Sequence, residues 1–153
     1  MVVDLAAAFF SGACTKISDS GSSKYTQALG GLLAGALSYY LAVFRNIPEI
    51  VLGTLLGNVF AGKVDKQSHY LLVATTLSLY AIYGVPVAVM PFLLFIISAY
   101  LDEYFSERED ILGKRVLLPL AALLYAVVDY RPLVYIIVWD AGYRFTSYLI
   151  KRD

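Results

Sequence analysis

Apolar residues fall into seven stretches along the chain, separated by short breaks. The stretches cover residues 2–18, 26–44, 49–64, 70–84, 85–101, 111–129 and 133–150. Each is close to, or shorter than, the roughly 20 residues that a helix needs to cross a bilayer. We therefore predict an all-α protein, a polytopic membrane bundle of seven short transmembrane helices that forms a single domain over residues 1–153.

The breaks contain residues that begin or end helices. Residues 18–23 are mostly capping residues, and Gly84 stands between the fourth and fifth stretches. Pro48 and Pro132 suit the first turn of a helix. The third and fourth stretches are the shortest, and the alternative is that they form a re-entrant pair, which leaves five complete spans.

Composition narrows the class of protein. Apolar residues make up 59% of the chain and the mean hydropathy is +0.69, so a water-exposed surface of ordinary charge density cannot be built. The 12 basic and 12 acidic residues balance, which argues against nucleic acid as a partner. The expected partners are the lipid bilayer, a lipid-phosphate or small-ion substrate, and further copies of the chain, because so small a bundle often forms a homo-oligomer.

Basic residues are unevenly divided between the two sides of the predicted bundle. Lys and Arg near helix ends stay on the cytoplasmic side of a membrane. If the connections alternate, one side receives only Arg45 and Arg131. We therefore predict a multi-pass protein of the cell membrane, with the N-terminus outside and the C-terminus in the cytoplasm. The predicted cytoplasmic residues are Lys16, Lys24, Lys63, Lys66, Arg108, Lys114, Arg115, Arg144, Lys151 and Arg152.

Carboxylates recur at the predicted cytoplasmic ends of three stretches. Asp19 follows the first, Asp65 the third, and the pair Asp102-Glu103 the fifth. Anions are disfavoured at helix C-termini, so their repetition suggests a shared role. If these ends converge, the four carboxylates offer the oxygen ligands that Mg²⁺ prefers.

Basic side chains lie close to these carboxylates in the sequence. Lys16, Lys24 and Lys63 are suited to neutralising a phosphate, and His69 adds an imidazole. A divalent ion flanked by lysines suits a lipid phosphate or a nucleotide. The alternative is purely structural, with the carboxylates capping the following helices and the lysines extending to the membrane surface.

Asp140 falls near the middle of the last stretch, where a carboxylate exposed to lipid costs roughly 2.5 to 3.5 kcal/mol. It is therefore expected to face the bundle interior. Arg144 follows one turn later, so the two residues either form an ion pair within the helix or contribute to a substrate site or ion path.

Glycines recur at a spacing typical of close helix packing. Gly31 with Gly35 and Gly53 with Gly57 each place two glycines on one helix face. Such pairs allow the backbones of neighbouring helices to approach closely. We predict that both pairs lie at helix interfaces.

Three segments share an order with a known family. Asp19, Lys24 and Thr26 precede a glycine-rich helix, a second glycine-containing segment runs over 53–63, and the acidic pair at 102–103 follows. In this order they resemble the CDP-lipid synthases, integral membrane cytidylyltransferases that include the CDP-archaeol synthases. The resemblance implies Mg²⁺-dependent nucleotidyl transfer to a lipid phosphate, with Asp65 and Asp102 as metal ligands and Lys24 holding phosphate.

These observations leave three functional hypotheses. The first is a metal-dependent enzyme that acts on a phosphorylated lipid or polyprenyl substrate at the cytoplasmic surface. The second is a small transporter or channel built around Asp140 and Arg144. The third is a non-catalytic membrane subunit.

Overall fold

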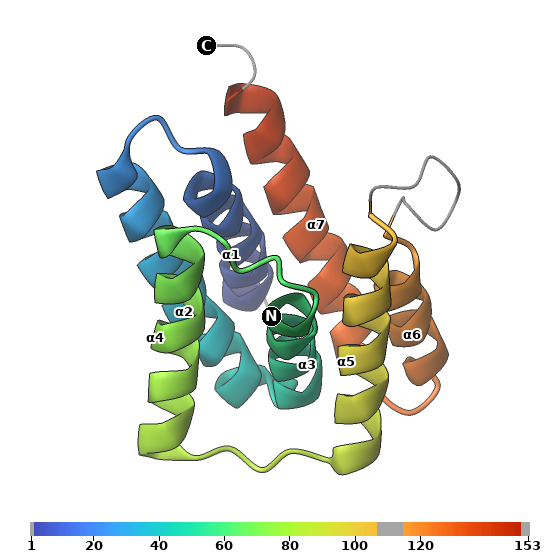
Figure 1. Cartoon of the computed structure of the whole chain (residues 1–153). Helices are drawn as coiled ribbons and strands as arrows, with labels where there is room; N and C mark the ends of the chain where they lie inside the picture. The colour runs from blue at the N-terminus through green and yellow to red at the C-terminus, as the bar shows by residue number, and fades with distance from the viewer. Residues whose placement is uncertain (1, 107–114, 151–153) are drawn as a thin grey trace.

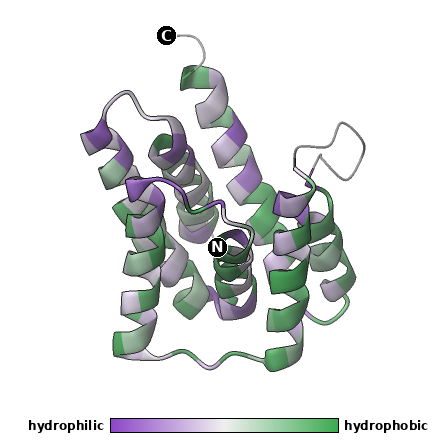
Figure 2. Cartoon of the chain, viewed as in Figure 1, coloured by the Kyte–Doolittle hydropathy of each residue, from purple (hydrophilic) through white to green (hydrophobic). Residues whose placement is uncertain are grey.

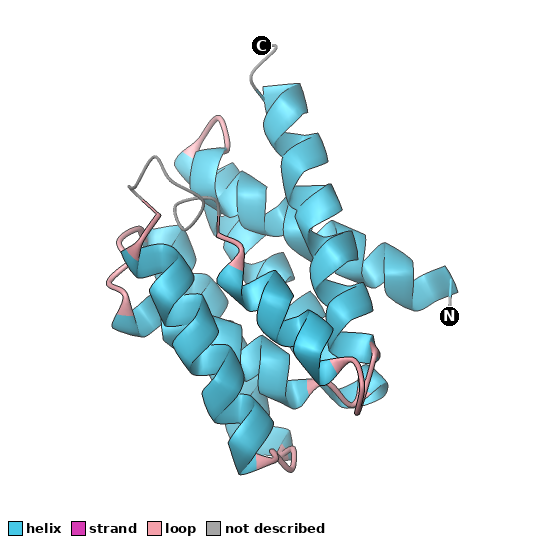
Figure 3. Ribbon diagram, turned by 90° about the vertical axis from the view of Figure 1, so that its right-hand side faces the viewer, coloured by secondary structure: helices cyan, strands magenta, loops and turns pink. Residues whose placement is uncertain are grey.

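The fold is known from a computed structural model, which describes residues 2–106 and 115–150. Within these residues the chain is all-helical and no strand occurs (Figure 3). The all-α prediction is therefore confirmed. The described helices are α1 (Val2–Ser20), α2 (Lys24–Arg45), α3 (Pro48–Phe60), α4 (Gln67–Tyr83), α5 (Val89–Tyr104), α6 (Leu117–Tyr125) and α7 (Arg131–Ile150).

The helix ends follow local chemistry. Ser23 caps α2 in a capping box with Thr26, Pro48 is the first residue of α3, and Gly84 ends α4 with a positive φ of 62°. The largest difference from the predicted stretches concerns residues 111–129, where α6 has only nine residues. Residues 107–114 lie outside the described part of the chain.

Six helices form a closed ring, and α4 packs on its outside. In the ring each helix contacts the next, in the order α1, α2, α3, α5, α6, α7, and α7 contacts α1 again. Helix α4 packs mainly against α2. In Figure 1, α1, α3, α5 and α7 end toward the top of the view, and α2, α4 and α6 end toward the bottom. The connections therefore alternate between two ends of the bundle.

Both arginines at the lower end of the bundle in Figure 1 are paired with an aspartate. Arg45 pairs with Asp4, and Arg131 pairs with Asp129 at 2.7 Å. Arg131 also donates a hydrogen bond to the backbone oxygen of Arg45, which ties α7 to the end of α2. The two basic residues assigned to the outer side thus lie together.

Both predicted glycine pairs lie at helix interfaces, as expected. A Cβ atom added to Gly35 would lie 2.7 Å from the backbone oxygen of Leu72 in α4. A Cβ atom added to Gly57 would lie 2.6 Å from the Cβ atom of Ala99 in α5. These distances are too short for a side chain, so the glycines set the separations of α2 from α4 and of α3 from α5.

Polar and apolar side chains are distributed in an unusual way. Small hydroxyl residues are buried between helices, such as Ser11 and Ser38, whose Oγ atoms lie 3.1 Å apart. Large apolar side chains remain exposed, including Met90 at 80% and Val127 at 92%. Figure 2 shows hydrophilic residues gathered toward the upper end and hydrophobic residues over much of the remainder.

By length and composition alone, one described helix, α2, is long and apolar enough to cross a membrane. The shorter helix α3 is also apolar. Within the described residues the fold is an all-helical bundle.

Candidate functional site

A cavity of about 480 Å³ opens among α3, α5, α6 and α7. One part of its wall is apolar and comes from α6 and α7, with Leu118, Pro119, Ile136 and Ile137. Another part is charged and comes from the end of α5, from the middle of α7 and from a residue before α6. The charged lining residues are Asp102, Glu103, Arg115, Asp140 and Arg144.

Two ion pairs lie on this wall. In α7, Nε of Arg144 lies 2.6 Å from Oδ2 of Asp140. Across the α5–α6 connection, Nη2 of Arg115 lies 2.9 Å from Oε2 of Glu103. Burial raises the pKa of Glu103, and the nearby charges of Arg115 and Lys63 oppose that rise. Both arginines are therefore positioned at the cavity by carboxylates.

Of the two interpretations of Asp140 and Arg144, the structure contains the intrahelical ion pair, and a role in a substrate site or ion path stays a prediction. The intrahelical ion pair forms, and both residues line the cavity. The side chain of Arg144 is 75% exposed and that of Asp140 is 45% exposed, so both remain accessible to a ligand.

Asp102 is buried and holds the beginning of α6. Its Oδ1 atom accepts a hydrogen bond from the backbone N–H of Leu117 at 2.8 Å, and its Oδ2 atom accepts one from Leu118 at 2.7 Å. Burial raises the pKa of Asp102, while these two bonds act in the opposite direction. Val116, the residue before α6, provides no side-chain cap, so a carboxylate from α5 takes that role.

Two stacked aromatic rings join the cavity to a second group of polar residues. The rings of Trp139 and Tyr143 are 5.6 Å apart, and both residues line the cavity. The hydroxyl of Tyr143 lies 3.4 Å from Oδ2 of Asp19, and Nζ of Lys16 lies 5.2 Å from the centre of the Tyr143 ring. The side chain of Tyr143 in α7 thus lines the cavity and also contacts the second group.

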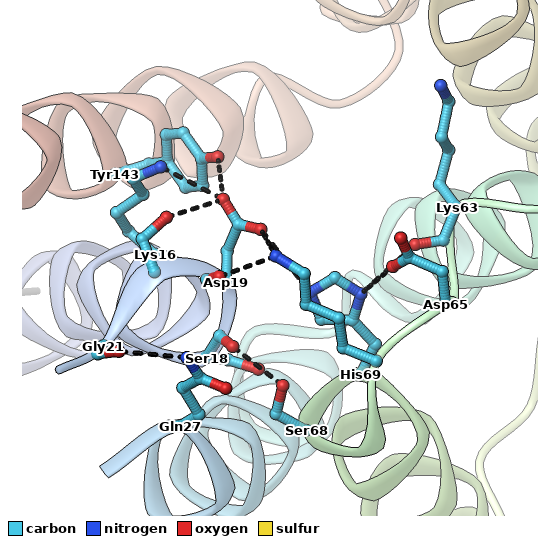
Figure 4. A network of polar contacts seen from close by, with 12 residues as sticks. Lys16, Ser18, Asp19, Gly21, Gln27, Lys63, Asp65, Ser68, His69 and Tyr143 are labelled. Atoms are coloured by element: carbon cyan, nitrogen blue, oxygen red, sulfur yellow. Dashed lines mark hydrogen bonds and ion pairs between the residues drawn. The ribbon is translucent and has the colours of Figure 1, made fainter. Parts of the chain in front are cut away.

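The second group is centred on Asp19 (Figure 4). Nζ of Lys16 lies 3.0 Å from Oδ2 of Asp19, and Nζ of Lys66 lies 2.9 Å from Oδ1. Partial burial raises the pKa of Asp19, but the hydrogen bonds from Lys66 and Lys16 outweigh it and hold the pKa well below its usual range. Because Lys66 precedes α4 in the chain, this carboxylate connects α1 to the start of α4.

His69 lies between two carboxylates in the same group. Its Nδ1 atom is 3.1 Å from Oδ1 of Asp65 and 3.2 Å from the backbone oxygen of Lys63. Its Nε2 atom is 3.9 Å from Oδ1 of Asp19. Figure 4 shows Asp19 and Asp65 on either side of the imidazole ring. The histidine separates the two carboxylates that the sequence analysis expected to share a metal ion.

Most of the predicted site residues divide into two groups, and Lys63 contacts His69 through its backbone oxygen. Asp102, Glu103, Asp140 and Arg144 line the cavity, whereas Lys16, Asp19, Asp65 and His69 form the Asp19 group. Lys24 is the first residue of α2 and is exposed. Within residues 2–106 and 115–150, no group of three or more His, Cys, Asp or Glu residues is arranged to hold a metal ion.

The magnesium ion remains a prediction, and the observed contacts of its proposed ligands do not favour it. Both oxygens of Asp102 accept backbone hydrogen bonds, and Asp19 is paired with two lysines. A carboxylate with these partners has fewer lone pairs available to a cation. The charged side chains that line the cavity are therefore better suited to binding a charged group of a ligand directly than to holding a metal ion.

Sequence reasoning missed three residues of these groups. Arg115 and Lys66 were counted only as basic residues, although the former pairs with Glu103 and the latter with Asp19. Trp139 had no assigned role. Its position four residues before Tyr143 was a usable signal, because residues at this spacing share a helix face.

Comparison of the chain with protein-family models, with curated proteins and with solved structures gives no match. Function must therefore be inferred from the geometry described above.

Proposed function

We propose that this chain is an integral membrane protein with seven short crossing helices, its N-terminus outside and its C-terminus in the cytoplasm. The support is the exposure of large apolar side chains such as Met90 and Val127, together with the burial of Ser and Thr between helices. An exterior of this kind is suited to contact with lipid. Lys66, in the connection between α3 and α4, pairs with Asp19 at the end of α1 at 2.9 Å, so this connection lies at the same end of the bundle as the end of α1, which favours seven crossings over a re-entrant α3–α4 pair.

The orientation follows from the two ends of the bundle. The lower end carries two arginines, each paired with an aspartate. The upper end carries Lys16, Lys66 and Arg115 as well as Arg144. By the positive-inside rule the upper end, with the cavity, faces the cytoplasm.

The cavity is proposed to bind a phosphorylated lipid, and its two-sided lining is the observation that carries this proposal. The guanidinium groups of Arg115 and Arg144 supply N–H donors for a phosphate. The apolar wall of α6 and α7 then receives the beginning of the hydrocarbon chain. Ile137 lines the cavity and is 58% exposed, so a chain lying on it reaches the apolar exterior.

Binding of this kind requires no metal ion. Nucleotidyl transfer, which the resemblance to the CDP-lipid synthases implies, is a further step that would need metal ligands in addition to the arginines. Phosphate binding is thus the part of the enzyme hypothesis that the described side chains support. The same binding would serve a non-catalytic subunit.

Trp139 provides the test, because it is the only tryptophan of the chain and lines the cavity. Phosphatidic acid with brominated acyl chains is titrated into the protein in uncharged maltoside micelles, and quenching of Trp139 fluorescence is recorded. Brominated diacylglycerol, which lacks the phosphate, measures quenching by lipid outside the cavity. We expect phosphatidic acid to quench at lower concentration than diacylglycerol.

The variant Arg144→Gln removes a cation from the cavity, and Arg131→Gln removes one from the opposite end. We expect weaker quenching by phosphatidic acid in the first variant only, with thermal unfolding recorded for both. Equal quenching by the two lipids in the unmodified protein would overturn the proposal.

A second candidate function is supported by a smaller cavity of about 70 Å³ beside the first. Thr54, Asn58 and Trp139 line both cavities, and Ser38 and Tyr135 line the smaller one. Polar side chains thus continue from the charged end toward the bundle centre, as a solute path requires. Solute flux into liposomes that is abolished by Asp140→Asn would support a transporter, and the absence of flux would remove this candidate.

A further inference from the structure

The charges on the cavity wall are of both signs. Two arginines and three carboxylates line it. One carboxylate, that of Asp102, is engaged with the backbone of α6. The remaining four charges form the pairs Asp140–Arg144 and Glu103–Arg115. The wall therefore has no excess of positive charge to offer a ligand.

A ligand that carries only negative charge fits this wall incompletely. A simple phosphate bound to the remaining N–H groups of Arg144 would lie close to Asp140, whose Oδ2 atom is 2.6 Å from Nε of the same guanidinium. The carboxylate would then repel the anion beside it. A ligand that brings a cation together with its phosphate satisfies both members of the pair.

The aromatic residues add a second feature that favours a cation. Trp139 and Tyr143 stack beside Asp140 on α7, and both line the cavity. The ring of Tyr143 already contacts the ammonium group of Lys16 at 5.2 Å and stacks on Trp139, so Trp139 is the aromatic side chain that remains for a ligand cation at the cavity. Aromatic faces attract ammonium groups, and the attraction adds to that of a neighbouring carboxylate.

We propose that the cavity selects a lipid whose head group joins a phosphate to an amine, with the phosphate at Arg144 and the ammonium at Asp140 beside Trp139. This inference rests on the proposed lipid-binding function and specifies its ligand. Phosphate and ammonium in such head groups are separated by two carbon atoms, a short linkage that suits a carboxylate and a guanidinium one helical turn apart.

The experiment compares two phosphodiester lipids that differ in the amine. Brominated phosphatidylethanolamine and brominated phosphatidylglycerol are titrated separately into the protein in maltoside micelles, with Trp139 quenching as the readout. Brominated phosphatidic acid is the reference that has a phosphate but no amine, and brominated diacylglycerol is the reference that has no phosphate. We expect phosphatidylethanolamine to bind about two- to five-fold more tightly than phosphatidylglycerol, the range for an exposed ion pair.

The variant Asp140→Asn should abolish this preference while phosphatidylglycerol still binds. Arg144→Gln should weaken the binding of both lipids. Asp129→Asn, which removes a carboxylate from the opposite end of the bundle, is the matched control and should keep the preference.

The outcomes separate the two proposals. If phosphatidic acid quenches no better than diacylglycerol, lipid-phosphate binding itself fails. If the phosphate-bearing lipids bind equally well, or if Asp140→Asn leaves the preference intact, the cavity binds phosphate but the amine selection proposed here is wrong.

Discussion

Asp102 permits the most direct test of the site geometry, because the sequence and the structure give it different roles. The sequence predicts that Asp102 is a metal ligand. In the fold Asp102 is 4% exposed and accepts hydrogen bonds from the first two backbone N–H groups of α6. The variant Asp102→Ala removes both acceptors. Asp102→Asn retains one oxygen and replaces the other with a donor group.

The expected loss of stability follows from these two bonds. Removal of a capping side chain costs about 0.5 to 2 kcal/mol, and a buried N–H group left without a partner costs about 1 to 3 kcal/mol. One of the two N–H groups is only partly buried, so we expect Asp102→Ala to lower the free energy of unfolding by about 2 kcal/mol. Asp102→Asn should lose roughly half as much, because one acceptor remains.

Unfolding by sodium dodecyl sulfate in maltoside micelles, followed by circular dichroism, provides the measurement. Amide hydrogen exchange should show reduced protection at Leu117 and Leu118 in Asp102→Ala. If both variants unfold at the same detergent fraction as the unmodified protein, the capping role is refuted. If Mg²⁺ stabilises the unmodified protein and neither variant, the metal-ligand role is supported in its place.

Two further predictions concern helix packing and pH. Gly57→Ala places a Cβ atom 2.6 Å from that of Ala99, so it should push α3 away from α5. The free energy of unfolding should fall by about 1 to 3 kcal/mol, measured as a lower detergent fraction at unfolding. An unchanged detergent fraction would contradict the close contact. The ion pairs of Asp19 hold its pKa below the ordinary 3.8, so they stabilise the fold fully above that pH, and the contribution is lost as the pH falls below it. Unfolding measured at pH 7 and at about pH 3 should therefore show a smaller acid-induced loss in Asp19→Asn than in the unmodified protein, and equal losses would contradict this role.

The Asp19 group also has a structural consequence for the cavity. Tyr143 contacts Asp19 through its hydroxyl and lines the cavity with its ring. Lys16 and Lys66 hold the carboxylate that Tyr143 approaches. These contacts position an α7 side chain at the cavity from α1 and from the residue that precedes α4. Lys16, predicted as a substrate ligand, thus contributes to the position of Tyr143 through Asp19.

The sequence by itself determined the helices and much of their packing faces. Ser23, Pro48 and Gly84 act through hydrogen bonds and backbone angles within their own segments, so local patterns were sufficient to place the ends of α2, α3 and α4. Glycine spacing likewise predicted that Gly31–Gly35 and Gly53–Gly57 lie at interfaces, because residues four apart share one face of any helix.

The tertiary structure decided which of the charged residues meet. Asp19, Asp65 and Asp102 all follow or end helices at one end of the bundle, yet Asp102 caps α6 and His69 separates the other two. Sequence periodicity fixes the face on which a side chain lies, but not the neighbour that this face meets. Distances between residues on different helices depend on the order of helices around the ring and on their separations, and these are set by packing over the whole bundle.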